Sequence, residues 1–280
     1  MKKSILLFVI SPFVCINFIF AQGFLWDSIS QQKFDQLEPL EIDSRVILPS
    51  KSSLEKFTPN AISQGNTPMC VAYALSNART ILYARNKKIT SRSKIEKIRF
   101  SPFFMHFNLV EDCQIPLYPD QGLDFLEDDG IAKMSSVEGE KYYPKTRNSR
   151  RLCDSYPKNH KTDRKEALKF KIDFYNTVKT ILQIKSSIYS GNPCLYGIYT
   201  PDSFHGVKTD LWKPSSREYP KRTGHHALVV IGYDDKKYGG SFRILNSWGA
   251  DWGDDGKVWI KYKDFKDYMI AAFSIHTIYE

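Results

Sequence analysis

The chain has 280 residues, of which 42% are hydrophobic and 25% charged, and its formal net charge is +9. This composition is typical of a globular protein and excludes collagen-like, intrinsically disordered and polytopic membrane classes. A chain of this length can bury a large core without a metal or disulfide to stabilise it, and it shows no internal repeat that would indicate a solenoid or propeller.

The N-terminal residues have the pattern of a secretory signal. Two lysines precede an apolar stretch from residue 5 to residue 20, and the small residue Ala21 follows. We expect residues 1–21 to be a signal peptide cut after Ala21, so that the protein is exported to the periplasm or the extracellular space. An uncleaved anchor is disfavoured, because about 16 apolar residues are short for a bilayer span. A lipoprotein is disfavoured because bulky Val14 precedes Cys15.

A short polar extension, residues 22–47, separates this signal from a domain over residues 48–280. The strongest helix prediction covers residues 69–86, because apolar residues recur there every three or four positions and would bury one face. Pro68 just ahead suits a first helical turn. Further helices are predicted over residues 121–129 and 177–190, each followed by a glycine.

The last third of the chain changes to short apolar or alternating runs between Gly, Pro and Asp turns, which predict strands. These runs cover residues 194–199, 227–233, 242–245, 258–262 and 272–278. Helices followed by strands predict an α+β protein with a helical lobe over about 60–165 and a β lobe over about 166–280. A site could then lie in the groove between the lobes.

The positive charge is concentrated in residues 145–171, which hold ten Lys or Arg and three acidic residues. A nucleic-acid or anionic-surface role is one interpretation. Regularly interleaved aromatic residues are missing from this run, so a solvated insertion is favoured and no nucleic acid is expected as a partner.

Three short segments contain residues suited to catalysis. The first places Cys70 at the start of the predicted helix, where the helix dipole and free backbone N–H groups favour the thiolate. The second is a histidine pair, His225 and His226, which opens a buried strand. The third is the Trp- and Gly-rich run of residues 245–256. Taken singly, Cys70 could be a buried apolar residue and His226 a satisfied core histidine.

Together these segments resemble the papain-like cysteine peptidases. That family has a glutamine six residues before a helix-start cysteine, a His-Ala that opens a strand ending in Gly-Tyr, and Asn-Ser-Trp-Gly-x-x-Trp-Gly-x-x-Gly. The same residue types occur here in the same order, over residues 64–70, 226–233 and 246–256. The resemblance covers about residue 48 to the C-terminus and implies a two-lobed fold, with a helical left lobe and an antiparallel, β-barrel-like right lobe.

The resemblance also assigns roles. Cys70 would be the nucleophile, His226 the base and acid, and Asn246 the residue that orients the imidazole, as in the Cys-His-Asn form of the triad. Gln64 would donate to the oxyanion together with the backbone N–H of Cys70, and Trp248 would shield the His–Asn hydrogen bond. Because successive strand residues face opposite sides, His225 and His226 cannot both reach Cys70. No metal or cofactor is implied.

The sequence departs from the family pattern in three places. The usual Cys-Gly-Ser-Cys-Trp around the nucleophile is replaced by Thr-Pro-Met-Cys-Val, which removes the neighbouring disulfide. The glycine pair that binds the substrate backbone is replaced by residues 113–118, where Pro116 has no N–H to donate. The 22–47 extension is shorter than the usual inhibitory propeptide; we expect its acidic segment, residues 24–43, to be dispensable for folding and at most a weak inhibitor.

The remaining cysteines are assigned from the same resemblance, which implies a disulfide between Cys113 and Cys153. Cys194 is expected to be a buried, reduced strand residue. The sequence therefore predicts an exported, monomeric cysteine endopeptidase acting on peptides or proteins through a thioester. A catalytically silent binding module with this fold, or an amidase or acyl transferase with the same chemistry, are the alternatives.

Overall fold

The computed structural model describes residues 23–137, 164–215, 217–218 and 224–278. The predicted signal peptide and most of the basic segment lie outside these residues. The longer helices are α1 (Ser28–Gln36), α2 (Cys70–Asn86), α3 (Arg92–Lys97), α4 (Pro102–Leu109), α5 (Pro119–Asp128), α8 (Ile181–Tyr189) and α10 (Tyr262–Asp267). The short helical segments are η1 (Glu55–Phe57), η2 (Met134–Ser136), α7 (Arg164–Ala167), η4 (Leu168–Phe170), α9 (Asp202–His205) and η6 (Lys237–Gly239).

The strands form one seven-stranded sheet, in which six run in the order β2-β7-β3-β4-β5-β6 and the seventh, β1, pairs with β4. Every pairing in this sheet is antiparallel. The bounds are β1 (Lys51–Ser53), β2 (Phe174–Thr177), β3 (Cys194–Thr200), β4 (Gly224–Asp234), β5 (Ser241–Leu245), β6 (Lys257–Lys261) and β7 (Met269–His276).

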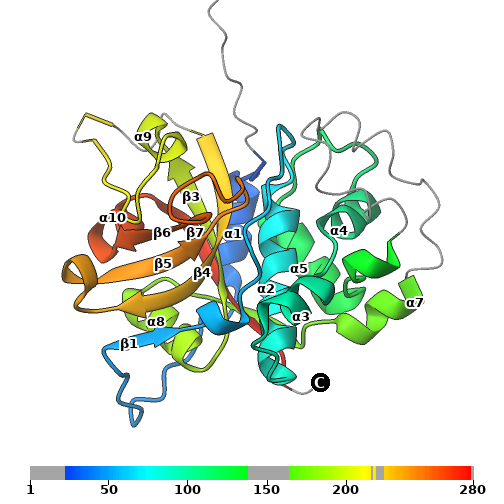
Figure 1. Cartoon of the computed structure of the whole chain (residues 1–280), viewed down its shortest axis with the longest axis horizontal. Coiled ribbons are helices and arrows are strands. Elements are labelled where there is room, and N and C mark those ends of the chain that lie inside the picture. The colour runs from blue at the N-terminus through cyan, green and yellow to red at the C-terminus, as the bar shows by residue number, and fades with distance from the viewer. Residues whose placement is uncertain (1–22, 138–163, 216, 219–223, 279–280) are drawn as a thin grey trace, which may run out of the picture.

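The α+β prediction is confirmed: in Figure 1 the helices α2 to α5 gather on one side and the sheet on the other. The antiparallel sheet of the β lobe is not closed within the described residues, with β2 and β6 as its outer strands. Its outer strand β2 pairs with β7 over residues 174–177 and forms a single parallel bridge from Thr177 to Pro39. At the opposite edge, Trp259 of β6 forms a single parallel bridge with Leu211.

Helix α2 follows its predicted bounds closely but is buried more completely than expected. Its periodicity predicted one buried face, whereas 14 of its 17 residues are buried. The reason is its central position: α2 packs against β4 on the side of the sheet and against α4 and α5 on the other. Small side chains along it, such as Ala72, Ala74 and Ala78, allow this close packing on several sides.

Helix α8 begins four residues later than predicted. Thr177 belongs to β2 and pairs with Phe273 of β7, so the chain is still extended at that point. Thr180 then caps the helix through a reciprocal capping box with Gln183. No helix in the described part of the chain is long and apolar enough to cross a membrane.

Residues 23–37, here called the N-terminal strap, pack between the two halves and do not hang free as a solvated extension. Phe24 and Phe34 are buried, and the Phe34 ring meets Phe273 of β7 edge-on at 5.2 Å. Asp27 caps α1 by accepting from the Ser30 N–H. Figure 1 shows α1 in blue behind the centre of the molecule. The strap is therefore part of the core, which weighs against the expectation that it is dispensable.

Candidate active site

Cys70 is the first residue of α2 and is fully buried, with a free thiol. Its sulfur accepts hydrogen bonds from the backbone N–H groups of Ala227 on β4 and Gly23 in the strap. Burial raises the pKa of the thiol to about 12, and these donors only partly offset the shift. The helix start was expected to lower this pKa; in the strap-covered structure desolvation is the larger effect.

His226 lies on β4 opposite Ile198 of β3, directly before the residue whose N–H reaches the Cys70 sulfur. Its Nε2 is 2.8 Å from the Asn246 Oδ1. The same oxygen accepts the backbone N–H of Ser247 at 2.7 Å, which identifies it as the oxygen of the amide. The imidazole therefore carries its hydrogen on Nε2, and within the described residues its buried Nδ1 has no hydrogen-bond partner.

Burial lowers the pKa of His226 to about 4, with the Asn246 hydrogen bond acting in the opposite direction. The imidazole is therefore neutral near pH 7, as is the Cys70 thiol. Trp248 stacks on the His226 ring, with centroids 4.5 Å apart, and covers it on the side of the 246–256 loop. The shielding of the His–Asn hydrogen bond by Trp248 stays a prediction.

Gln64 is held by hydrogen bonds to Thr67 and to Ser247, the residue after Asn246. Its Nε2 donates to the carbonyl of Thr67 at 2.7 Å, and its Oε1 accepts from the Ser247 hydroxyl at 2.5 Å. Its backbone N–H also donates to the Ser247 carbonyl. One hydrogen of the amide NH₂ remains for another acceptor. The first N–H groups of a helix lack partners within that helix, so Cys70 supplies a second donor at the same point.

His225, the neighbour of the predicted base, faces a different group. Its ring meets Tyr199 edge-on at 5.2 Å and Phe24 at 6.5 Å. The hydrogen bond to Asn246 comes from His226 instead. The two histidines of β4 are thus separated as strand alternation predicts.

The strap covers the site. Phe24 is only 3% exposed, and its ring fills the space beside Gly197 of β3, where a Cβ would lie 2.4 Å from the ring. Phe24 also forms a parallel bridge with Leu117, whose carbonyl accepts the Leu25 N–H at 3.0 Å. Residues 113–118, which replace the expected glycine pair, therefore do pair with an extended chain. The pairing uses the carbonyl after Pro116, so the missing N–H is not needed.

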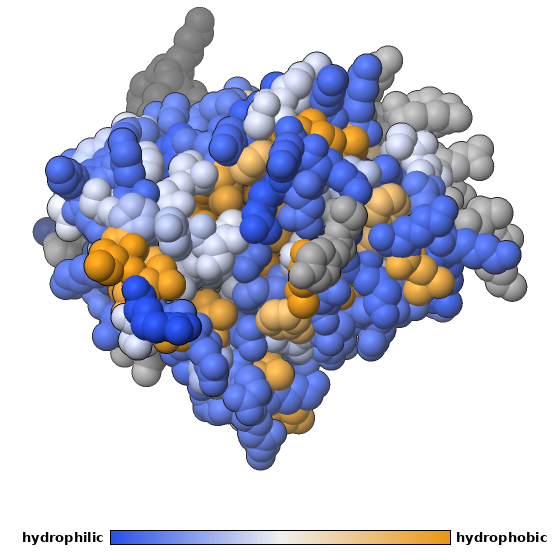
Figure 2. Space-filling model, turned by 90° about the horizontal axis from the view of Figure 1, so that it is seen from below, coloured by the Kyte–Doolittle hydropathy of each residue, from blue (hydrophilic) through white to orange (hydrophobic). Residues whose placement is uncertain are grey.

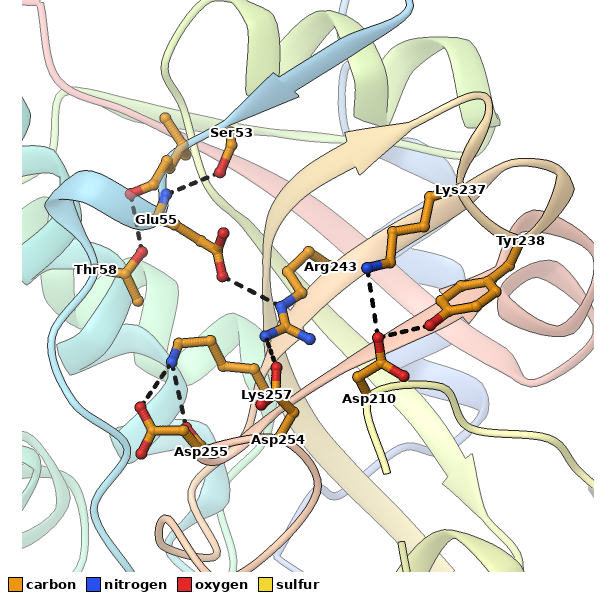
Figure 3. Close-up of polar contacts among 11 residues, drawn as sticks. Ser53, Glu55, Thr58, Asp210, Lys237, Tyr238, Arg243, Asp254, Asp255 and Lys257 are labelled. Carbon is orange, nitrogen blue, oxygen red and sulfur yellow. Dashed lines mark hydrogen bonds and ion pairs between the residues drawn. The ribbon is translucent and has the colours of Figure 1, made fainter. Parts of the chain in front are cut away.

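The 246–256 loop is tied to the sheet by the ionic network in Figure 3. Arg243 on β5 is nearly buried and donates to Asp254 at 2.6 Å and to Glu55 of η1 at 3.2 Å. Lys257 contacts Asp255 at 3.3 Å in the same turn. Through Arg243, the C-terminal end of the loop that carries Asn246 and Trp248 is joined to β5 and η1.

The remaining predicted site residues are the cysteines of the expected disulfide. Cys113 is buried and disulfide-bonded. Cys153 lies outside the described residues, so the Cys113–Cys153 pairing stays a prediction. Cys194 is buried on β3 as a free thiol that donates to the Ser187 hydroxyl at 3.2 Å, in agreement with its assignment as a reduced strand residue.

A family-wide sequence profile described as papain family cysteine protease matches residues 106–278. The chain belongs to the papain family of cysteine proteases. The matched region includes His226 and Asn246, while Gln64 and Cys70 precede it. The assignment of Gln64 and Cys70 therefore rests on the sequence motif around them and on the fold.

Curated relatives and solved structures agree with this family. The chain is 26% identical over 87 residues to a gut-specific cysteine proteinase of Caenorhabditis elegans, covering 31% of this chain and 26% of the relative. It is 30% identical over 109 residues to a cathepsin B-like cysteine proteinase of Ostertagia ostertagi, covering 38% and 29%. The matches thus span less than a third of the length of these relatives.

The crystal structure of xylellain, a cysteine protease from Xylella fastidiosa, superposes with a TM-score of 0.71 at 22% identity. The alignment covers 92% of this chain and 97% of xylellain. This likeness establishes the papain-like fold over nearly the whole chain.

Two groups near the papain-like site were missed by sequence reasoning. Phe24 follows the predicted signal cut by only three residues, and no local pattern marks it as part of a buried site. His205 stacks on Trp248 with centroids 5.0 Å apart, but it lies outside all three motifs. Both contacts arise from the tertiary fold, so no spacing rule could have found them.

Proposed function

We propose that this papain-family chain is an exported cysteine endopeptidase whose catalytic residues are Cys70, His226 and Asn246. The observation that carries the proposal is the orientation of the His226 imidazole. Its Nε2 is hydrogen-bonded to Asn246, while its Nδ1 has no partner among the described residues. The Cys70 sulfur accepts from the backbone N–H of Ala227, the residue that follows His226 on β4. Peptides or proteins are the substrates, and the chain acts as a monomer.

The chemistry follows from these positions. The Cys70 sulfur attacks the peptide carbonyl carbon as its proton passes to Nδ1 of His226. Gln64 and the Cys70 N–H donate to the oxyanion, and one such donor stabilises the transition state by roughly 3 kcal/mol. The C–N bond breaks as the imidazolium gives its proton to the leaving amine. Water then cleaves the thioester, with His226 acting as base.

We also propose that the strap holds the enzyme in a latent form. The Gly23 N–H donates to the Cys70 sulfur, so the strap lies directly against the proposed nucleophile. It also supplies part of the burial that keeps the thiol protonated. Signal cleavage after Ala21 would leave Gln22 as the first residue, directly ahead of Gly23.

Displacement of the strap should therefore activate the thiol. Phe24→Ala removes the ring that anchors the strap beside Gly197, so we expect faster alkylation of Cys70 by iodoacetamide and faster peptide hydrolysis, each by at least tenfold. Phe174→Ala, which removes an exposed ring on β2, is the matched control and should change neither rate. Equal alkylation rates in the Phe24→Ala and unaltered chains would contradict latency.

The catalytic assignment is tested by thiol exchange in the Phe24→Ala chain. Cys70→Ser should abolish hydrolysis of a fluorogenic peptide, whereas Cys194→Ser, the matched substitution of the other free thiol, should retain it. Hydrolysis that survives Cys70→Ser would refute the assignment. A chain that never hydrolyses peptide, with the site exposed, would be the silent binding module, and product captured by an added amine in place of water would indicate an acyl transferase.

A further inference from the structure

A small apolar pocket lies between α8, α10 and the start of β7, in the half of the molecule that holds the sheet (Figure 1). Its volume is about 110 Å³. The apolar side chains that line it are Ile181 and Ile184 of α8, Phe265 of α10 and Met269 of β7. Ile184 and Phe265 are buried and form the floor, while Ile181 and Met269 are half-buried and lie nearer the mouth.

This pocket is separate from the site that the strap covers. The Tyr196 ring of β3 stacks on Phe265 at 3.8 Å, so α10 covers the face of the sheet to which Tyr196 points. The next residue, Gly197, faces Phe24 of the strap. Because successive strand residues point to opposite faces, the pocket and the strap lie on opposite faces of the sheet. A ligand in the pocket would therefore not occupy the Cys70 site.

Two lysines complete the lining of the pocket: Lys179, just ahead of α8, and Lys266, near the end of α10. A lysine beside an apolar pocket packs its methylene stem along the wall and keeps its ammonium group in water. Thr180 also lines the pocket, but its hydroxyl is used to cap α8. The lining thus combines an apolar interior with two positive charges at the mouth.

Both ammonium groups can be reached by a ligand. Lys179 is 3.4 Å from Asp35, and because these side chains are 39% and 59% exposed, the ion pair is weak and can exchange. Lys266 is exposed, and the acidic residue that follows it, Asp267, is bound to Lys263 at 2.6 Å. A ligand carboxylate would therefore compete with Asp35 for Lys179 and with water for Lys266.

We propose that this pocket binds a small carboxylate that carries a compact apolar group. The apolar group packs against Ile184 and Phe265, where it is removed from water, and the carboxylate lies beside the ammonium groups of Lys179 and Lys266. A mostly apolar lining with a few polar groups that fix the orientation of the ligand is typical of small-molecule sites. The ligand is a free short-chain acid or the C-terminal residue of a peptide, since both have this chemistry.

Binding is tested with isocaproate, by NMR of the methionine methyl groups and without any need for catalysis. The acid should shift the Met269 resonance saturably, with a Kd of about 1 mM for a ligand of this size, while the buried Met69 and Met105 stay unchanged. Isocaproamide has the same shape without the charge and should bind at least about fivefold more weakly. N-acetyl-leucine distinguishes the sources: if it binds as well as isocaproate, the pocket accepts a peptide C-terminus, and if isocaproate alone binds, the ligand is a free acid.

Substitution of the lining residues tests the pocket itself. Lys266→Gln and Lys179→Gln should each weaken the binding of isocaproate by about threefold to fivefold, because each removes one partly exposed ion pair with the carboxylate. Lys97→Gln, which changes an exposed lysine of α3, is the matched control and should leave the affinity unchanged. Ile181→Phe narrows the pocket and should abolish the Met269 shift, with circular dichroism as a check of folding. A Met269 resonance that neither acid moves, equal affinity for isocaproate and its amide, or unchanged affinity in both lysine variants would overturn the inference.

Discussion

At the scale of single residues, the site depends on which hydrogen-bonding atoms are already committed. His226 and Asn246 are both almost fully buried, and their mutual bond uses Nε2 and Oδ1. The amide nitrogen of Asn246 is left without a partner within the described residues, as is Nδ1 of His226. Leaving buried polar groups unpaired is costly, which is typical of a functional site and unusual in a core built only for stability.

The choice between the two histidines gives a kinetic prediction in the Phe24→Ala chain. His226→Ala should remove nearly all turnover, because it removes the ring that is hydrogen-bonded to Asn246. His225→Ala should cost at most about tenfold, as expected for one non-catalytic contact. Steady-state kinetics on both variants, with circular dichroism as a check of folding, decide the assignment. An inactive His225→Ala chain beside an active His226→Ala chain would reverse it.

The motifs identified Gln64, Cys70, His226, Asn246 and Trp248, because each belongs to a fixed local spacing. The structure brings these residues together, but their catalytic roles stay a prediction until turnover is measured. Local spacing could not reveal His205 or Phe24. Their positions depend on which distant ring or glycine they pack against, and that is decided only when β3, β4 and the strap come together.

At the scale of elements, those with an apolar pattern of their own were predicted, and those that depend on pairing with a distant strand were not. Helix α2 and strands β3 to β7 were predicted because each has a long apolar period of its own. Strand β1, with three residues, and β2, with four, were not predicted, since each is stabilised by pairing with a strand far away in sequence. The late start of α8 has the same origin, because β2 takes residues that helical periodicity would include.

Arg243 offers an element-scale prediction, because it joins β5 to η1 and to the active-site loop. Arg243→Met removes both ion pairs while it keeps the buried stem. Since Glu55 and Asp254 are 43% and 54% exposed, their carboxylates can be hydrated, and we expect a loss of about 1–2 kcal/mol in the free energy of unfolding. Lys263→Met, which breaks the exposed pair with Asp267, should change it by less than about 0.5 kcal/mol. Urea denaturation measures both free energies of unfolding. Equal losses would show that the Arg243 ion pairs stabilise the fold no more than one exposed ion pair does.

At the scale of the whole molecule, the strap and the two halves form one packed core. Phe24 and Phe34 contact the sheet, while Leu25 and Lys33 contact the helical side through Leu117 and Asp120. Figure 2 shows that the face seen from below is mainly hydrophilic, with apolar patches separated by polar side chains.

The predicted Cys113–Cys153 disulfide would close a loop of about 40 residues on the helical side and stabilise the fold by roughly 3–4 kcal/mol in the chain-entropy model. A non-reducing peptide map of the exported protein should contain a peptide that joins Cys113 and Cys153, with Cys70 and Cys194 free. The same map after reduction is the control. Cys113 joined to any other cysteine, or both residues alkylated without reduction, would contradict the pairing.

The central claim is that Cys70 is the nucleophile of a papain-like site covered by the strap. The most direct measurement is treatment of the Phe24→Ala chain and the unaltered chain with a thiol-directed epoxide, followed by mass mapping of the labelled cysteine. We predict label on Cys70 in both, much faster in Phe24→Ala, no label on Cys194, and loss of hydrolysis in proportion to labelling. Label on Cys194 with Cys70 untouched, or full labelling of Cys70 with hydrolysis unchanged, would contradict the account.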